Sequence, residues 1–291
     1  GLSLAGVVGS LAIVAMSSWL NATALAGAAA IEQHYWPKFA GDKLPLSPEA
    51  SALALADRLD TLVGLFGINQ PPTGSKDPYA LRRATVGLLR IMIEQELELD
   101  LLSLIDNAYS LHVNLKQDQD TTRSQLHNFI IERLRAYYDD QNIKTEVYLA
   151  VNANKPSSPL DFDRRVKAVN HFLTLDSASS LTEANKRVSN ILAKNGKGSG
   201  HVSKTLLVET DEKALNQALT EVNQANQTSI AQGDYQSTLT RLADLAEPLE
   251  AFFASTMVMA DDKAIKDNRL ALLSNIQVEL ARVANIALLA Q

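Results

Sequence analysis

The spacing of apolar and polar residues predicts a chain built from amphipathic helices. From residue 47 onward, apolar side chains recur every three to four positions, which is the period of a helix with one buried face. No run of useful length alternates with the two-residue period of a strand, and no internal repeat is found. We therefore expect an all-α fold.

Capping residues and prolines mark where the expected helices begin and end. Ser47, Pro48 and Glu49 form a typical N-terminal signal, and Asp77-Pro78 repeats it. Pro248 is expected to kink or divide one long helix. The predicted helices are about 47–66, 78–92, 101–115, 121–138, 145–152, 160–175, 180–194, 211–231, 235–259 and 264–289.

Breaks in the helical pattern suggest two domains. Residues 154–159 combine two prolines and two serines between helical runs, so we place a boundary there, between 28–155 and 156–291. Residues 195–200 are rich in glycine and form an expected loop.

Residues 1–27 are atypical. No charged residue occurs from Gly1 to Ile31, and the stretch 2–15 is almost wholly apolar. Such a run suggests a membrane span or a signal peptide. Serine, threonine, asparagine and glycine dilute it, however, and no basic residue precedes it. We therefore expect no membrane association and interpret the segment as a divergent start or a sequence artefact.

Composition excludes several classes of site. The chain has no cysteine, which excludes disulfides, thiolate zinc sites and cysteine nucleophiles, and which fits a cytoplasmic location. Its 27 basic and 33 acidic residues give a net charge of −6. This balance argues against nonspecific coating of nucleic acid, although a local basic face still acts within a Debye length of roughly 8 Å.

Motifs for catalysis are missing from the sequence. No phosphate-binding glycine loop is found, and none of the five histidines forms an HExxH or His-Asp motif. We therefore predict no catalytic residue and no metal site. Asp57 and Asp60 lie one helical turn apart and suit a shared metal, but neighbouring Arg58, Arg82 and Arg83 favour a structural ion-pair network.

Several long blocks, in order along the chain, resemble one known family. Residues 57–68 read DRLDTLVGLFGI and residues 71–83 read PPTGSKDPYALRR. Further blocks are HYWPKFAGDKLP at 34–45, ANKRVSNIL at 184–192, AFFASTMVM at 251–259, NRLALL at 268–273 and RVANI at 282–286. From about residue 28 to the end, the chain resembles the C-terminal portion of the glycyl-tRNA synthetase β subunit.

The resemblance implies a fold and a function. It implies an HD-type helical domain over 28–155, followed over 156–291 by a helical anticodon-binding domain shared with arginyl-tRNA synthetases. It also implies a heterotetrameric glycine–tRNA ligase that attaches glycine to its tRNA using ATP and Mg. The α subunit is expected to hold the catalytic centre, and this chain to bind glycine tRNA and no cofactor. The block containing Asp57, Asp60, Lys76, Arg82 and Arg83 is a family signature of uncertain role.

Basic residues next to an exposed amide are the candidate tRNA contacts. Lys186, Arg187, Asn190 and Lys194 fall outside the apolar stripe of one helix, where cations meet phosphates and an amide reads a base edge. A solvated helix face is the alternative. Arg269 and Arg282 are further candidates on the expected last helix, although Arg282 also suits a pair with Glu279.

Two other functions remain open at this point. An HD-type metal phosphohydrolase is one, although the chain lacks the His-Asp motif. A non-catalytic, membrane-tethered helical protein is the other, and it depends on residues 1–27 alone.

Overall fold

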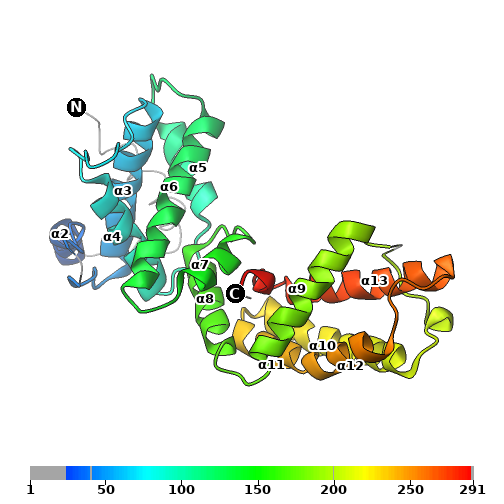
Figure 1. Cartoon of the computed structure of the whole chain (residues 1–291). Helices are drawn as coiled ribbons and strands as arrows, with labels where there is room; N and C mark the ends of the chain where they lie inside the picture. The colour runs from blue at the N-terminus through cyan, green and yellow to red at the C-terminus, as the bar shows by residue number, and fades with distance from the viewer. Residues whose placement is uncertain (1–23, 40, 199, 290–291) are drawn as a thin grey trace. The chain divides into compact units, whose positions relative to one another are not determined.

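The computed structural model describes residues 24–39, 41–198 and 200–289 (Figure 1). Within these ranges the regular structure is helical, apart from one isolated bridge between Thr73 and Lys76, so the all-α prediction is confirmed. No described helix is long and apolar enough to cross a membrane. The expectations for residues 1–23 lie outside the described ranges.

The chain folds as two compact units, and α3 organises the first. This unit extends to Asn142 and takes in Ser157–Leu160. α3 packs against each of the other four helices, and α4, α5 and α6 stand beside it in Figure 1. The helices are α2 (Ala24–Gln33), α3 (Pro48–Gly67), α4 (Leu81–Glu94), α5 (Leu101–Leu111) and α6 (Gln119–Asp139).

The two N-terminal signals act in different ways. The Ser47 side chain accepts a hydrogen bond from the Ala50 amide and caps α3, as expected. Asp77 instead reaches forward to the amides of Leu81 and Arg82, and α4 begins only at Leu81. The carboxylate therefore satisfies two unpaired amides of the first turn from outside the helix.

Arg58 ties an irregular segment to α3. Its side chain is buried and donates to the backbone carbonyls of residues 34–37 and of Ala54. Because burial removes the guanidinium from water, the pKa of Arg58 is lowered. The backbone carbonyls take the place of that water as hydrogen-bond acceptors. The backbone conformation of residues 34–37 therefore depends on Arg58.

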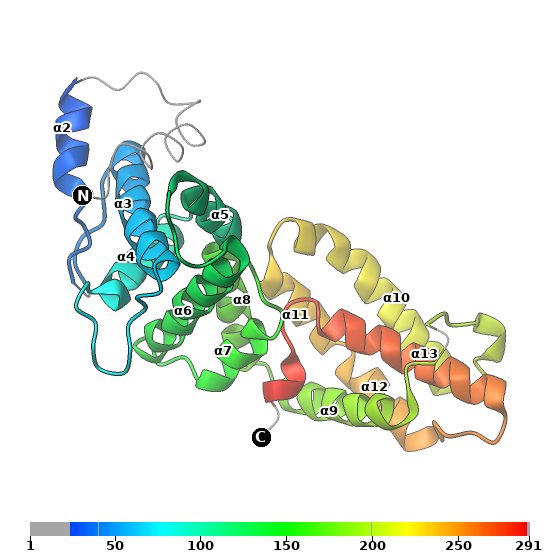
Figure 2. The same cartoon turned by 90° about the horizontal axis from the view of Figure 1, so that it is seen from above.

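The second unit comprises Ile143–Pro156 and the chain from Asp161 onward. Within it α13 packs against both α9 and α10, and α12 also contacts both (Figure 2). The helices from α7 on are α7 (Thr145–Asn152), α8 (Pro159–Phe172), α9 (Ala178–Asn195), η1 (Lys204–Leu206), α10 (Thr210–Ala231), α11 (Tyr235–Ala243), α12 (Ala246–Ser255), α13 (Lys263–Leu280) and η2 (Ile286–Leu289).

The division between the units differs from the expected boundary at 154–159. α7 belongs to the second unit, where the Asn285 amide donates to the Ala150 carbonyl at 2.9 Å. The Asn154 side chain also donates to the Ala281 carbonyl at 2.6 Å. These contacts join positions more than 120 residues apart, so local composition did not reveal them.

Pro248 divides the expected helix 235–259, but the break lies upstream of it. α11 ends at Ala243 and α12 begins at Ala246, which places Pro248 in the first turn of α12. A proline needs no amide partner in a first turn, and its ring clashes with the carbonyl four residues earlier. The expected last helix also ends early, at Leu280.

Two polar clusters, one buried and one partly buried, join segments of the second unit. Glu212 is fully buried and accepts from the amides of Val208 and Glu209, at 2.7 and 3.0 Å, and from the Arg269 guanidinium. Arg269 also donates to the Met257 carbonyl at 2.6 Å. One ion pair thus joins the start of α10, the segment after α12, and α13.

The second cluster joins α8, α11 and the C-terminal turn. The Tyr235 hydroxyl donates to Asp161, and Arg165 donates to the Tyr235 oxygen at 3.0 Å. Arg165 also donates to the carbonyls of Arg282 and Val283, both at 2.8 Å. Burial, with the nearby Asp161 carboxylate, raises the pKa of Tyr235 to about 12.

We predict that Arg269→Met destabilises the second unit by about 3–5 kcal/mol, because it leaves the Glu212 carboxylate buried without its cation. Urea unfolding followed by circular dichroism measures the change. Lys263→Met is the matched control, since Lys263 forms an exposed pair with Asp267 and should leave the unfolding transition nearly unchanged. Similar unfolding curves for the two variants would contradict the assignment.

Candidate nucleic-acid interface

Helix α9 presents the central candidate residues on its outer face. Its inward positions include Leu181, Val188 and Leu192, which are buried. The helix ends at Asn195 and is followed by Gly196, whose φ of +84° is a conformation that L side chains rarely adopt. The side chains of Lys186, Arg187, Asn190 and Lys194 are exposed, as the helical period predicted.

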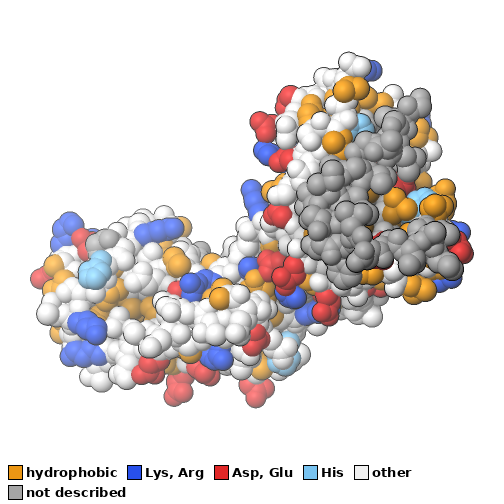
Figure 3. Space-filling model, turned by 180° about the vertical axis from the view of Figure 1, so that it is seen from behind, with side chains coloured by type: hydrophobic (Ala, Val, Ile, Leu, Met, Phe, Trp, Pro, Cys, Tyr) orange, Lys and Arg blue, Asp and Glu red, His pale blue; other side chains and the backbone are white. Residues whose placement is uncertain are grey.

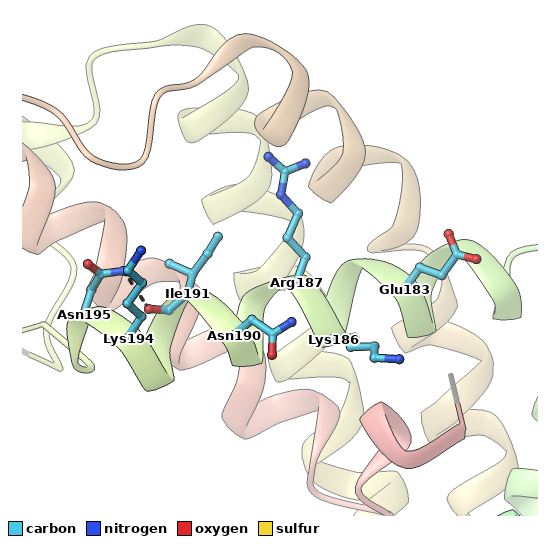
Figure 4. A pocket seen from close by; sticks show the side chains of 7 residues that line it. All are labelled: Glu183, Lys186, Arg187, Asn190, Ile191, Lys194 and Asn195. Atoms are coloured by element: carbon cyan, nitrogen blue, oxygen red, sulfur yellow. Dashed lines mark hydrogen bonds between the residues drawn. The ribbon is translucent and has the colours of Figure 1, made fainter. Parts of the chain in front are cut away.

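These four residues line one open pocket of about 540 Å³ along α9, which we call the α9 groove (Figure 4). Its remaining lining residues are Glu183, Ile191 and Asn195. Three cations against one carboxylate give the groove a positive balance. Such a surface attracts anionic groups, even on a chain of negative net charge.

Arg187 is held by an aromatic ring. Its guanidinium lies 4.1 Å from the ring centre of Phe253 on α12, and in Figure 4 it points away from Lys186. Phe253, Glu250 and Arg187 line a neighbouring pocket between α9 and α12. A guanidinium plane fixed in this way can stack with an unpaired base as well as pair with a phosphate. Phe253 lies 66 positions from Arg187, so the local sequence does not predict this contact.

Asn190 keeps its amide available at the surface. No hydrogen bond to its side chain is found among the described residues, whereas the Asn195 side chain donates to the Ile191 carbonyl at 2.9 Å. Asn190 therefore offers one acceptor and two donors to a ligand.

Arg269 does not lie on this surface, which corrects the expectation for it. Its side chain is 7% exposed and is committed to Glu212 and the Met257 carbonyl. The structure therefore favours a structural role for Arg269 over an RNA contact.

Arg282 lies beyond the end of α13, so it does not share a helix with Arg269 as expected. Its guanidinium pairs with Glu279 at 3.1 Å and reaches the Asn223 side chain at 3.5 Å. Burial raises the pKa of Glu279, and the charge of Arg282 opposes that shift. This pairing is the alternative that the sequence left open.

The signature block in the first unit has a different arrangement from the expected arginine network. Asp60 lies 3.0 Å from Nε2 of His112, at the end of α5, and no ion pair of the described chain joins Asp57 or Asp60 to Arg82 or Arg83. Burial raises the pKa of Asp60, while the nearby His112 opposes the shift. Arg82 donates to the Gly74 carbonyl at 2.6 Å, and Lys76 and Arg83 are exposed.

Metal-ligating side chains do not gather in the described part of the chain. No group of three or more His, Cys, Asp or Glu residues there is placed to hold a metal ion. The Asp60–His112 contact offers two such groups only. The phosphohydrolase alternative thus gains no support from this geometry.

Charge is unevenly distributed on the second unit. In the left-hand part of Figure 3, acidic side chains gather along the lower edge, whereas most Lys and Arg side chains lie above it. This separation lets a chain of net charge −6 present local basic surface.

Two family models match successive parts of this chain, in the order of the two domains that the resemblance implies. A family model described as the glycyl-tRNA synthetase beta subunit matches residues 20–153. A second model, the DALR anticodon binding domain, matches residues 181–287 and therefore contains α9. The first match also includes residues 20–27, part of the segment expected to lie outside the family.

Curated relatives named glycine–tRNA ligase beta subunit align with nearly the whole chain. The Aeromonas salmonicida protein is 51% identical over 263 residues, or 90% of this chain and 38% of the relative. The Shewanella woodyi protein is 49% identical over 272 residues, or 93% of this chain and 39% of the relative. The Haemophilus influenzae protein is 48% identical over 262 residues, with shares of 90% and 38%. The chain thus spans less than half the length of these relatives, and it belongs to the glycyl-tRNA synthetase β-subunit family.

Proposed function

We propose that this chain supplies the tRNA-binding part of a glycine–tRNA ligase β subunit, and that the α9 groove contacts the tRNA. The observation that carries the proposal is the exposed set of Lys186, Arg187, Asn190 and Lys194, which lies inside the segment matched by the anticodon-binding model. The names of the relatives supply the ligase and its amino acid.

Each side chain of the groove has a distinct part in the proposal. Lys186 and Lys194 meet backbone phosphates as point charges. Arg187, seated on Phe253, offers a flat cation to a phosphate or a base. Asn190 has no charge, and its amide suits the edge of an unpaired base. Phosphates would thus set affinity and register, while Asn190 would contribute to the choice of tRNA.

The whole ligase is proposed to divide its work between subunits. An α subunit would hold the catalytic centre, use ATP and Mg to activate glycine, and assemble with the β subunit as a heterotetramer in the cytoplasm. This chain would bring glycine tRNA to that centre and bind no cofactor itself. The expected HD-type character of the first unit remains a prediction.

We predict that Lys186→Ala/Lys194→Ala weakens binding of a glycine tRNA by roughly tenfold at low salt. Loss of two phosphate contacts should also flatten the log–log salt dependence by about 1.4, at about 0.7 for each contact. Affinity measured at several salt concentrations gives both quantities. Asn190→Ala should leave the slope unchanged and reduce the preference for glycine tRNA over a non-cognate tRNA.

Lys213→Ala/Lys263→Ala is the matched control, because it removes the same charge from exposed positions of the same unit outside the groove. Equal slopes for the two double variants would show that the α9 cations are only solvated. Circular dichroism checks that helix content is preserved.

We also predict that the purified chain does not form glycyl-adenylate from glycine and ATP when the α subunit is absent. The reason is that neither a nucleotide-binding motif nor a class II core motif is found in the sequence. Pyrophosphate exchange measures the reaction. Exchange that persists in a preparation shown to be free of α subunit would overturn the proposed division of work.

A further inference from the structure

A second open pocket, of about 640 Å³, lies between α10 and α13. It shares no lining residue with the α9 groove. Carboxamide side chains dominate its wall: Asn216, Asn223, Gln224, Gln227 and Asn275. Leu219 and Val278 supply apolar surface within the same pocket, and Val278 is 57% exposed.

The amides of this pocket are not committed to the fold. Asn223 accepts only a long contact of 3.5 Å from Arg282, and no hydrogen bond within the described residues holds the side-chain amides of Asn216, Gln224, Gln227 or Asn275. Asn226 on the same helix provides a contrast. It is buried, donates to the Thr238 carbonyl and accepts from Arg241.

Helix stability does not explain the asparagines of this set. Asparagine is among the poorer helix formers, less favourable than alanine by up to about 0.7 kcal/mol in a helix interior. Residues 216, 223, 224 and 227 nevertheless follow the i, i+7, i+8, i+11 spacing that brings them to one face of α10. Helical geometry thus gathers four carboxamide side chains on one face of α10, where the described hydrogen bonds engage only Asn223.

The chemistry of the pocket suits an uncharged, flat and polar ligand. Arg282 and Glu279 pair with each other at 3.1 Å, so their charges compensate locally. The pocket therefore has little net attraction for a phosphate. The carboxamides present both donors and acceptors, which match the edge of a nucleobase, and Leu219 and Val278 can cover its face.

We propose that this amide pocket holds one unpaired nucleobase of the bound tRNA and reads its edge through Asn223, Gln227 and Asn275. The proposal rests on the proposed function, because it takes the ligand to be tRNA. It adds a second contact, which discriminates between bases, to the α9 groove, which senses mainly phosphates.

The test compares affinities of the full chain for a glycine tRNA transcript and for transcripts that each carry one substituted nucleotide in the anticodon loop. We expect the parent chain to bind at least one substituted transcript more weakly by about fivefold or more. Asn223→Ala/Gln227→Ala should abolish that difference at one position and leave the log–log salt slope unchanged. Asn275→Ala, on the opposite wall, should act at the same position.

Gln217→Ala/Thr228→Ala is the matched control, since both positions are exposed on α10 and lie outside the pocket. It should retain the full discrimination. If the pocket variants discriminate like the parent, or if the parent binds tRNA without distinguishing any substituted transcript, the pocket does not read a base, while the α9 proposal stands. If the parent binds no tRNA at all, the proposed function and the pocket assignment both fail.

Discussion

The buried ion pair of Glu212 and Arg269 is the interaction on which the second unit depends. Glu212 caps the start of α10 by accepting from two backbone amides that precede the helix, and Arg269 joins that carboxylate to α13 and to the Met257 carbonyl. A buried pair is costly to form and more costly to break singly, so it fixes one arrangement of these segments. Both candidate surfaces follow from it, because α13 packs on α9 and forms one wall of the amide pocket.

Several arginines are buried or partly buried in the two units, although Arg187 is exposed in the α9 groove. Arg58, Arg165 and Arg269 direct their guanidinium groups at backbone carbonyls and at acidic partners inside the two units. The planar fork and weak hydration of arginine suit such positions. Lysines remain at the surface, where Lys186 and Lys194 line the α9 groove. A negative net charge is therefore compatible with tRNA binding, provided that a few phosphate contacts are combined with uncharged amides that select bases.

Local sequence was sufficient to predict the helices from α3 to α10 and the exposed face of α9, whereas α2 was not expected and the helix expected over 264–289 ends at Leu280. Apolar spacing identified Val188 and Leu192 as inward positions, and a serine next to a proline marked the start of α3. Contacts between positions far apart in the chain could not be predicted from local sequence. Arg269 became buried because Glu212, 57 positions away, accepts its charge, and Arg187 found its aromatic partner on α12. The amide pocket needs α10 and α13 together, so neither helix alone indicated it.

If tRNA binds to the second unit through α9, as proposed, lysine footprinting detects the contact. Acetylation of exposed lysines, read by mass spectrometry with and without glycine tRNA, compares Lys186 and Lys194 with Lys76 of the first unit. We expect tRNA to protect Lys186 and Lys194 and to leave Lys76 as reactive as before. Protection of Lys76 with unchanged reactivity at both α9 lysines would contradict the proposal.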